Sequence, residues 1–422
     1  MKYVIIGGGP AGIFAAEAIR RRDRSSSIVI VTDEGEIARS PVMLTYWIGG
    51  EAPRDGIRFR DPSWAEMNRV DLQLCRRTVA LKTSLQKLIL DSGEEVSYDR
   101  LLIATGSSPI SLPIPGAGLK GVHILRQVSD AEAILGAIPT LRQVIIIGGG
   151  FIGLKVASHL KERGVEVLIL EKEDRLAPRM FDGKASLFLA DLLGRKGIRA
   201  ETGVEVEEIL GKAGRVDAVR MKDGRILPGQ MVIQSVGVRP NTAFLAGSGI
   251  FLEKGIPVDP RMETNVPGVY AAGDVALTLD SLTGEKVNNA TWPAASRQGT
   301  VAGTNMAGGN ASYVHNLSLN AFHLCGVPAM AAGNSGESGG QVLVEEGSDS
   351  YRKILLQDGR LTGFILIGKI SQAGSLLALM KKKEILSDAR LLPVALLRRK
   401  KLPQGYGYRH GSLFIRSTGE RS

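Results

Sequence analysis

The chain has 422 residues, 44% of them hydrophobic, which is enough to bury more than one core, so we expect two or three domains. Its 52 glycines follow no fixed period, which excludes a collagen-like repeat and favours tight turns against ligands. The formal net charge is +10, but much of it lies near the C-terminus and no helix-turn-helix, zinc or RNA-recognition motif accompanies it, so we predict no nucleic acid partner.

The first predicted element is a strand, a turn and a helix over residues 3–22, YVIIGGGPAGIFAAEAIRRR. In such a unit the first glycine permits the turn, the second lets the backbone approach a pyrophosphate, and the third lets the helix pack closely on the strand. The candidate contacts are Gly7, Gly9, Pro10, Ala11 and Gly12. A second strand, SSSIVIVTDE, ends in Asp33 and Glu34, where a carboxylate would hold ribose hydroxyls. We predict a nucleotide site; the alternative is a tight structural turn.

The same pattern recurs over residues 141–175, LRQVIIIGGGFIGLKVASHLKERGVEVLILEKEDR. Its candidate contacts are Gly148, Gly150, Phe151, Ile152 and Gly153. The strand that follows ends in Glu171, and a carboxylate there accepts hydrogen bonds from a 2′-hydroxyl and repels a 2′-phosphate, which favours NAD(H) over NADP(H). Lys172 and Arg175 lie close by and oppose that preference. The alternative is that Glu171 is a solvated strand end.

The last third of the chain contains a helix and a group of short strands. NNATWPAASRQGTVAGTNMAGG predicts a helix with Thr291 or Asn289 near its cap and Pro293 in its first turn, where the missing N–H costs nothing. SYRKILLQDGRLTGFILIG predicts a hairpin, followed by the helix ISQAGSLLALMKKKEIL. We predict His323 and Cys325, just before these strands, as core residues. After Leu392 the chain is basic and polar, and we do not expect it to fold alone.

Two glycine-rich units in tandem resemble the flavoprotein pyridine nucleotide reductases. YDRLLIATGSSP resembles that family's segment closing the first FAD lobe, QSVGVRPNT its second connecting motif, and TNVPGVYAAGDVA its late FAD fingerprint. The resemblance implies an α/β fold with two Rossmann-like domains and a small α+β C-terminal domain. The implied parts are an FAD-binding domain over 1–110 and 241–312, an inserted NAD(H)-binding domain over 111–240, a C-terminal interface domain over 313–392, and a basic tail over 393–422.

The resemblance also implies cofactor contacts outside the glycine-rich turns. For FAD these are Arg39, Ser40, Val79, Ala104, Thr105, Gly106, Gly273, Asp274, Thr291 and Trp292, and a further nucleotide contact is Gly237. Arg39 would supply phosphate charge because Pro41 stands where many members have arginine. The helix after Thr291 would direct its positive end at the flavin and stabilise the anionic reduced ring. Trp292 would lie over or beside the isoalloxazine; the alternative is that it is a core residue.

The cysteines separate the branches of this family. Cys75 and Cys325 form neither C-x-x-C nor C-x-x-x-x-C, so we predict no disulfide framework and no metal site, and expect both to be buried small side chains. Val42 or Met43 occupies the position at which the peroxidase, oxidase and coenzyme A-disulfide reductase branches carry a cysteine. Without a thiolate, disulfide and peroxide chemistry lose their mechanism. The resemblance therefore implies the ferredoxin and rubredoxin reductase branch.

Lys155 departs from that branch. Ferredoxin reductases often pair a lysine after the first FAD segment with a glutamate on the second glycine-rich helix, and those positions are here Tyr46 and Lys155. A cation in the first turn of a helix is disfavoured by the helix dipole unless an anion pairs with it. We hypothesise that Lys155 is catalytic, approaching the flavin or nicotinamide and stabilising reduced flavin. The alternative is that the aliphatic part of the Lys155 side chain packs along the domain interface.

The implied function is an FAD-dependent NADH:acceptor oxidoreductase that exchanges electrons with an iron-sulfur protein or with partner subunits, as in the NAD-reducing FAD subunits of anaerobic oxidoreductase complexes. It would work as a homo- or hetero-oligomer. No run of about 18 apolar residues occurs, so we predict no membrane span and a cytoplasmic location. Two alternatives remain open: a cysteine-independent NADH oxidase, and a nucleotide-binding sensor or scaffold without turnover.

Overall fold

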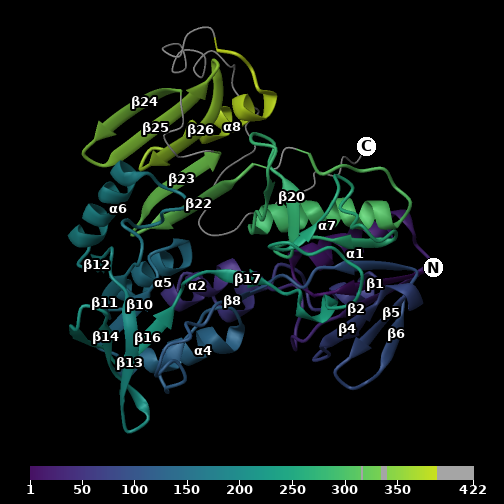
Figure 1. The fold of residues 1–422 in the computed structure, drawn as a ribbon, viewed down its shortest axis with the longest axis horizontal. Helices are drawn as coiled ribbons and strands as arrows, with labels where there is room; N and C mark the ends of the chain where they lie inside the picture. The colour runs from purple at the N-terminus through teal and green to yellow at the C-terminus, as the bar shows by residue number, and fades with distance from the viewer. Residues whose placement is uncertain (315–316, 334–339, 387–422) are drawn as a thin grey trace, which may run out of the picture.

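The computed structural model describes residues 1–314, 317–333 and 340–386, and the predicted basic tail at 393–422 lies outside them. Figure 1 shows the described residues as three packed parts. One part, at the right, combines the N-terminal segment (purple) with late segments (green). A second part, at the left, is formed by the blue and teal segments between them, and a yellow-green sheet lies above it.

The right-hand part is built on a parallel sheet whose strand order is β19-β7-β1-β2-β3. Its strands are almost continuous apolar runs because helices and loops cover both faces. The bounds are β19 (Val269–Ala271), β7 (Arg100–Ile103), β1 (Lys2–Ile6), β2 (Ser27–Val31) and β3 (Val70–Gln73). Since β19 pairs with β7, the late segment adds the last strand to a sheet that the N-terminus begins.

Two helices of this part pack backbone to backbone. Helix α1 (Pro10–Arg22) lies against α7 (Trp292–Met306), as Figure 1 shows. A Cβ added at Gly299 would lie 2.1 Å from the carbonyl oxygen of Ala11, and one at Gly303 would lie 2.2 Å from that of Ala15. Side chains at these positions would force the helices apart. The late helix is thereby held against the helix of the first glycine-rich unit.

The left-hand part repeats the same architecture. Its parallel sheet has the order β12-β11-β10-β16-β9. The strands are β12 (Arg199–Glu201), β11 (Glu166–Leu170), β10 (Gln143–Ile147), β16 (Met231–Gln234) and β9 (Val122–His123), and the helices are α4 (Val128–Ala137), α5 (Phe151–Glu162) and α6 (Gly183–Arg195). Helix α2 (Pro41–Gly49) comes from the N-terminal segment but packs its buried Leu44 and Ile48 into this second core.

A short antiparallel ribbon joins the two parts. The chain leaves the first part through β8 (Ser107–Pro109) and returns through β17 (Val238–Pro240), and the two strands pair with each other. Figure 1 shows this ribbon between the left and right parts. The inserted unit is therefore connected at one place, with its outgoing and incoming strands side by side.

The C-terminal part is an antiparallel sheet of order β22-β23-β26-β25-β24 with one helix against it. The elements are β22 (Leu319–Leu324), β23 (Val327–Gly333), β24 (Gln341–Gly347), β25 (Ser350–Gln357), β26 (Arg360–Ile367) and α8 (Ala373–Lys382). Lys353, only 1% exposed, places its Nζ 2.6 Å from an Oδ of Asp182, the residue that caps α6. This ion pair ties the C-terminal sheet to the left-hand part.

The remaining elements are peripheral to these sheets. They are β4 (Thr78–Lys82), β5 (Lys87–Leu90), β6 (Glu95–Ser97), β13 (Val206–Lys212), β14 (Arg215–Met221), β15 (Ile226–Pro228), β18 (Ile256–Pro257), β20 (Ala276–Leu279), β21 (Lys286–Val287), α3 (Trp64–Met67), and the 3-10 turns η1 (Arg54–Ile57), η2 (Thr83–Leu85), η3 (Ile138–Thr140) and η4 (Ala243–Leu245). Within the described ranges, no helix is long and apolar enough to cross a membrane. The predicted fold class is confirmed.

Two burial predictions are wrong, and a third is met only in part. Cys75 is exposed, whereas Cys325 is half-buried and packs against the second core; both lie in tight turns with positive φ. His323 is also exposed, since it alternates with the buried Phe322 and Leu324 along β22.

Candidate functional site: a cleft between two glycine-rich turns

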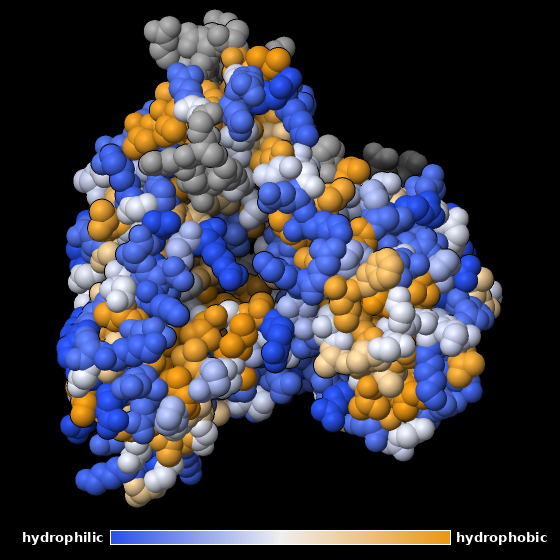
Figure 2. Space-filling model, viewed as in Figure 1, coloured by the Kyte–Doolittle hydropathy of each residue, from blue (hydrophilic) through white to orange (hydrophobic). Residues whose placement is uncertain are grey.

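A continuous cleft of about 3760 Å³ runs between the two parallel sheets and reaches strand β22 of the C-terminal sheet. Figure 2 shows the surface hollowed between the left and right parts, with apolar side chains (orange) on its wall. Ligands of open α/β sheets bind at the carboxyl ends of the strands, and both glycine-rich turns lie at such ends. Of the residues predicted to contact cofactors, only Gly12, Gly153 and Val79 do not line this cleft.

The first turn is shaped by three glycines with different surroundings. Gly7 has a φ of +113°, and a Cβ there would lie 2.2 Å from the carbonyl oxygen of Ala104. A Cβ at Gly12 would lie 2.0 Å from the carbonyl oxygen of Gly7, so Gly12 serves the packing of α1 on β1 and does not reach the cleft. Gly9 has nothing within 4 Å of its Cβ position and starts α1 without a side-chain cap. The free N–H groups and open space at Gly9 suit a pyrophosphate.

The second turn repeats these surroundings. Gly148 has a φ of +108°, and a Cβ there would lie 2.4 Å from the carbonyl oxygen of Ser235. A Cβ at Gly153 would lie 2.1 Å from the carbonyl oxygen of Gly148. Gly150 faces open space, and it starts α5 without a side-chain cap. The two turns therefore offer the same kind of anion site from opposite sides of one cleft.

The acidic residues after the two second strands are not equivalent. Glu171 immediately follows β11, is 8% exposed, and accepts hydrogen bonds from the backbone N–H groups of Gly149 (2.6 Å) and Glu173 (2.9 Å). The alternative that Glu171 is a solvated strand end is therefore wrong, because one oxygen is held by the glycine-rich turn and the other by the backbone of Glu173. At the corresponding position after β2 stands Thr32, which is buried, and the predicted acids Asp33 and Glu34 come one and two residues later.

Arg39 and Glu34 form an ion pair on the wall of the cleft. The nearest Arg39 nitrogen lies 2.6 Å from a carboxylate oxygen of Glu34, and the Arg39 side chain is 12% exposed. Its Nε is buried without a hydrogen-bond partner. Part of the charge that Arg39 could offer to a phosphate is thus already balanced by Glu34, while one donor remains open toward the cleft.

The three connecting motifs meet at the ribbon between the two parts. The Ser107 hydroxyl donates to an Oδ of Asp274 at 2.8 Å, and the Thr105 hydroxyl donates to the carbonyl oxygen of Asn241 at 2.9 Å. Arg126, which sequence reasoning missed, lies 3.9 Å from the same carboxylate of Asp274. No local motif marks Arg126, because it belongs to a loop far from Asp274 in the chain.

Helix α7 begins at the cleft as predicted. Thr291 is its N-cap, with its hydroxyl accepting from the N–H of Ala294 at 3.4 Å, and Pro293 lies in the first turn. Trp292 is half-buried, and its ring makes edge-to-face contacts with Phe14 (5.7 Å) and Phe59 (5.5 Å). Its Nε1 is buried and has no hydrogen-bond partner. Trp292 therefore belongs to the wall of the cleft and is not only a core residue.

Lys155 is 2% exposed and lies on α5 one turn after Gly150. Its Nζ lies 3.6 Å from the centroid of the Tyr46 ring, which is a cation-π contact. This tyrosine-lysine pair occupies the positions at which ferredoxin reductases often have a lysine-glutamate pair. Burial lowers the pKa of Lys155 to about 8, an effect that the charge of Glu51 partly offsets. A lysine side chain with this pKa is present in both protonation states close to neutral pH, which suits a group near redox chemistry.

The polar atoms of the cleft fit two dinucleotides. Among the described residues, eight contain a buried polar side-chain atom without a hydrogen-bond partner, and five of these line the cleft: Arg39, Thr78, His159, Gln234 and Trp292. Buried polar groups are normally paired, so such a concentration indicates missing ligand atoms. Together with the open Cβ positions of Gly9 and Gly150, the residues present fit a dinucleotide at each turn.

Val79 is the predicted contact that the structure does not bring to the cleft with its side chain. It lies on β4 with 42% of its side chain exposed, while its neighbour Thr78 lines the cleft. The pairing of β4 with β5 shifts register between Thr78 and Ala80, and at this irregularity Thr78 is buried while Val79 points outward. Thr78 was missed because no residue-type signal distinguishes it from Val79 in the sequence.

Glu171 gives a test of nucleotide choice. We expect Glu171→Gln to lower the ratio of kcat/KM for NADH over NADPH about tenfold or more, because the amide keeps an acceptor for Gly149 but removes the charge that repels a 2′-phosphate. Steady-state kinetics with both nucleotides measure the ratio. Asp174→Asn is the control, since Asp174 is exposed and paired with Arg175. An unchanged ratio in Glu171→Gln would contradict the assignment.

Comparison with known protein families agrees with this geometry. A family model described as pyridine nucleotide-disulphide oxidoreductase matches residues 1–299, and one described as rubredoxin NAD+ reductase C-terminal domain matches residues 320–384. The second match covers the antiparallel sheet β22–β26 and α8.

Individual proteins extend the comparison. The chain is 32% identical to the NADH-dependent phenylglyoxylate dehydrogenase subunit epsilon of Aromatoleum evansii, over 92% of this chain and 93% of that one. It is 36% identical to an NADH oxidase of Methanocaldococcus jannaschii, over 74% of this chain and 71% of that one. Its fold matches the crystal structure of a ferredoxin reductase for the CYP199A2 system from Rhodopseudomonas palustris, with a TM-score of 0.82 and 27% identity over 88% of this chain and 92% of that one.

Proposed function

Because this chain belongs to the pyridine nucleotide-disulphide oxidoreductase family and is an FAD- and NAD(H)-dependent oxidoreductase, we propose that it passes electrons between NAD(H) and an iron-sulfur protein or partner subunit. One observation carries the proposal: the two glycine-rich turns open into one cleft, and neither of the two cysteines lies at either turn. Bound FAD supplies the chemistry that joins two-electron hydride exchange to single-electron transfer.

The two cysteines do not offer a thiol route. Cys75 is exposed and does not line the cleft. Cys325 does line it, but its backbone N–H donates to the hydroxyl of Ser158, which lies seven residues after Phe151 and so about 10 Å along α5 from the turn. Burial raises the pKa of the Cys325 thiol, which keeps it protonated and weakly nucleophilic. Val42 and Met43 occupy the position of the thiol in other branches.

Residues of this chain orient the bound cofactor and stabilise its charge. The N-terminus of α7, capped by Thr291, presents its positive end to the cleft, and Trp292 forms an aromatic wall there. Lys155 contributes a buried positive charge from α5 that Tyr46 holds in place. We propose that these groups favour the reduced, negatively charged form of the bound cofactor.

The kind of partner is supported by what the relatives are. One relative that matches almost the whole chain is a subunit of an NADH-dependent dehydrogenase, and the C-terminal sheet matches a rubredoxin reductase domain. A ferredoxin reductase shares the fold over most of both chains. We propose that this chain likewise serves an iron-sulfur acceptor or donor, as a subunit or as a separate reductase, and works as part of an oligomer.

Purification from the native source tests the proposal. We expect an iron-sulfur oxidoreductase to co-purify with this chain in a fixed ratio. After anaerobic reduction by NADH, the bound flavin should be reoxidised at least about tenfold faster by the iron-sulfur partner than by air-saturated buffer, because docking of complementary charges speeds encounter. Stopped-flow absorbance of the flavin measures both rates. Equal rates, with no iron-sulfur protein recovered, would contradict the proposal.

A second function has one specific observation in its favour, the 36% identity to an NADH oxidase. In that case oxygen would be the acceptor and no partner would be required. Fast NADH consumption in air by the purified chain alone, at a rate that the iron-sulfur partner does not increase, would favour it over the first proposal.

A further inference from the structure

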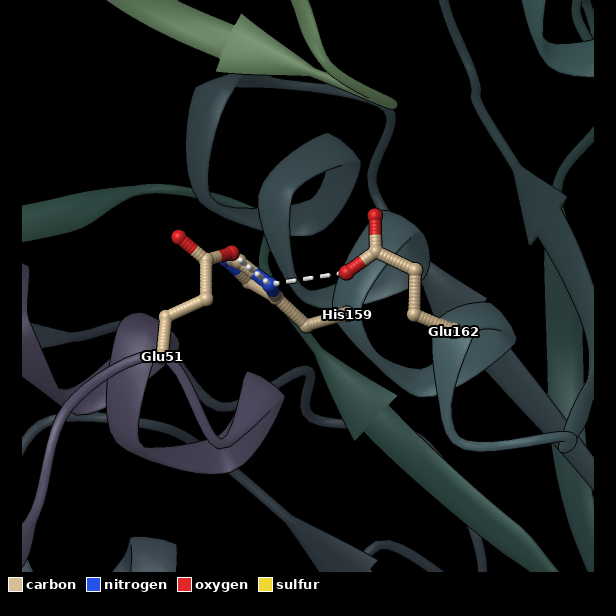
Figure 3. A group of neighbouring side chains, drawn as sticks. All are labelled: Glu51, His159 and Glu162. Carbon is tan, nitrogen blue, oxygen red and sulfur yellow. Dashed lines mark ion pairs between the residues drawn. The ribbon is translucent and has the colours of Figure 1, made fainter. Parts of the chain in front are cut away.

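Three side chains converge beside α5, outside the two glycine-rich turns. Glu51 follows α2, while His159 and Glu162 are three residues apart on α5 and so lie on one face of that helix. Figure 3 shows both carboxylates directed toward the imidazole. One ligand atom from each of the three residues lies within 4.8 Å of the others.

The buried Nδ1 atom of an imidazole lies at the centre of this group. His159 is 5% exposed, and its Nδ1 makes no hydrogen bond of good geometry. Nδ1 lies at ion-pair distance from both carboxylates, 3.2 Å from an Oε of Glu51 and 3.6 Å from an Oε of Glu162. Buried polar atoms are normally paired. A buried imidazole nitrogen and two carboxylate oxygens that approach one another this closely have the arrangement of metal ligands.

Three neighbours hold this arrangement. A Cβ at Gly49 would lie 2.3 Å from Nδ1 of His159, so only glycine lets the ring reach its position. The hydroxyl of Ser158 donates to the other oxygen of Glu162 at 3.3 Å. The Tyr46 ring packs on the imidazole, with centroids 5.6 Å apart. These contacts orient the His159 ring and one carboxylate before any ion binds.

Two cations lie near this group. Lys155 and Arg163 are the cations facing the group, and the latter is engaged through its Nε with the carbonyl oxygen of Gly49.

The two separations from Nδ1 of His159 match zinc coordination. Zinc binds imidazole nitrogen at about 2.0–2.1 Å and carboxylate oxygen at about 2.0–2.2 Å, so separations of 3.2 and 3.6 Å correspond to ligand-metal-ligand angles of about 100° and about 120°. These angles lie on either side of the tetrahedral value. A mixed imidazole and carboxylate set suits first-row divalent ions, zinc among them.

We propose that Glu51, His159 and Glu162 bind one divalent ion of the zinc type, with water completing its coordination. The ion connects the segment after α2 to α5, the helix of the second glycine-rich turn. Because α2 carries Tyr46 and α5 carries Lys155, it fixes the two helices that make the tyrosine-lysine contact. Its role is structural, and it neither requires nor replaces the proposed electron acceptor.

Zinc binding to the full chain tests this site. After treatment with EDTA and dialysis against zinc, we expect one zinc per chain by elemental analysis, and a higher thermal unfolding midpoint with zinc than without. Glu51→Gln and Glu162→Gln change exposed side chains that do not support the core, and each should weaken zinc binding about tenfold or more. Both should also lose the zinc-dependent rise in midpoint.

The control is His323→Gln, because His323 is an exposed imidazole on the wall of the same cleft but not in this group. It should bind zinc as the unmodified chain does. The proposal is overturned if the unmodified chain binds no stoichiometric zinc, if Glu51→Gln and Glu162→Gln bind it with unchanged affinity, or if His323→Gln is the variant that loses it.

Discussion

Gly150→Val should abolish reduction of the bound flavin by NADH while the protein keeps its fold and its FAD. Gly150 has an extended backbone conformation that any residue can adopt, and no atom lies within 4 Å of its Cβ position. A valine there therefore fits the protein but fills the space where the pyrophosphate of NAD(H) would lie. We expect kcat/KM for NADH to fall about 100-fold or more, since even small misplacement of a reacting group costs about that much.

Two matched variants make this result specific. Gly9→Val places the same side chain in the same kind of open position in the first turn, and it should prevent FAD binding instead. Gly148→Val should fail to fold, because its Cβ would lie 2.4 Å from a backbone oxygen at a φ of +108°. Flavin absorbance after purification and stopped-flow bleaching by NADH separate the three cases. Normal bleaching in Gly150→Val would mean that this turn does not bind NAD(H).

Lys155→Met should stabilise the protein at pH 7 and make its bound flavin harder to reduce. Burial lowers the pKa of Lys155 from 10.5 to about 8, and a difference of this size corresponds to about 3 kcal/mol of unfolding free energy lost when the lysine is charged. Removing the lysine also removes its contact with Tyr46, which contributes up to about 2 kcal/mol. We therefore expect a net gain of about 1–2 kcal/mol, measured by chemical denaturation in metal-free buffer.

The pH dependence of this gain has a defined sign. Between pH 8 and 10.5 the unfolded chain binds more protons at this lysine than the folded chain does, so the unmodified protein becomes more stable as pH rises through that window. The advantage of Lys155→Met should therefore be largest below pH 8 and be lost as the pH rises towards about 10.5. Lys161→Met is the control, because Lys161 is paired with Glu166 near the end of the same helix and should change stability by no more than about 0.5 kcal/mol.

The same variant tests the role proposed for Lys155 in the cleft. If its charge stabilises the reduced cofactor, Lys155→Met should lower the two-electron midpoint potential of the bound flavin by about 30 mV or more, which corresponds to about 1.4 kcal/mol. Redox titration with an indicator dye measures the potential. A gain in stability with no change in potential would leave Lys155 as a residue of the interface between α2 and α5.

The glycine-rich turns illustrate what can be predicted without a structure. Each function of the turn depends on residues that are close in sequence: the glycines, the apolar strand before them and the helix after them. The spacing alone therefore placed Gly7, Gly9, Gly148 and Gly150 at the ends of parallel strands, and it placed Thr291 at the cap of a helix. The two glycine-rich turns, the fold class and the absence of a thiol at Val42 and Met43 could all be predicted in this way.

The direction of a single side chain within a helix or strand was harder to predict from the sequence. Val79 and Thr78 are adjacent on β4, and only the packed structure decides that Thr78 faces the cleft. Likewise His323 stands among apolar residues but faces outward, since strand alternation opposes the local composition. Composition indicates how much of a segment is buried, whereas the direction of one side chain depends on the register of its strand.

By itself, the sequence determined the parts that are encoded over a few consecutive residues. These are the two glycine-rich turns, their order along the chain, and the lack of a redox thiol beside them. Only the tertiary structure decided which distant residues meet. It placed Tyr46 over Lys155, and it brought Glu51 from the first part to His159 and Glu162 on α5. The physical reason is that a contact between residues far apart in the chain depends on how α2 packs against α5, and no local spacing encodes that packing.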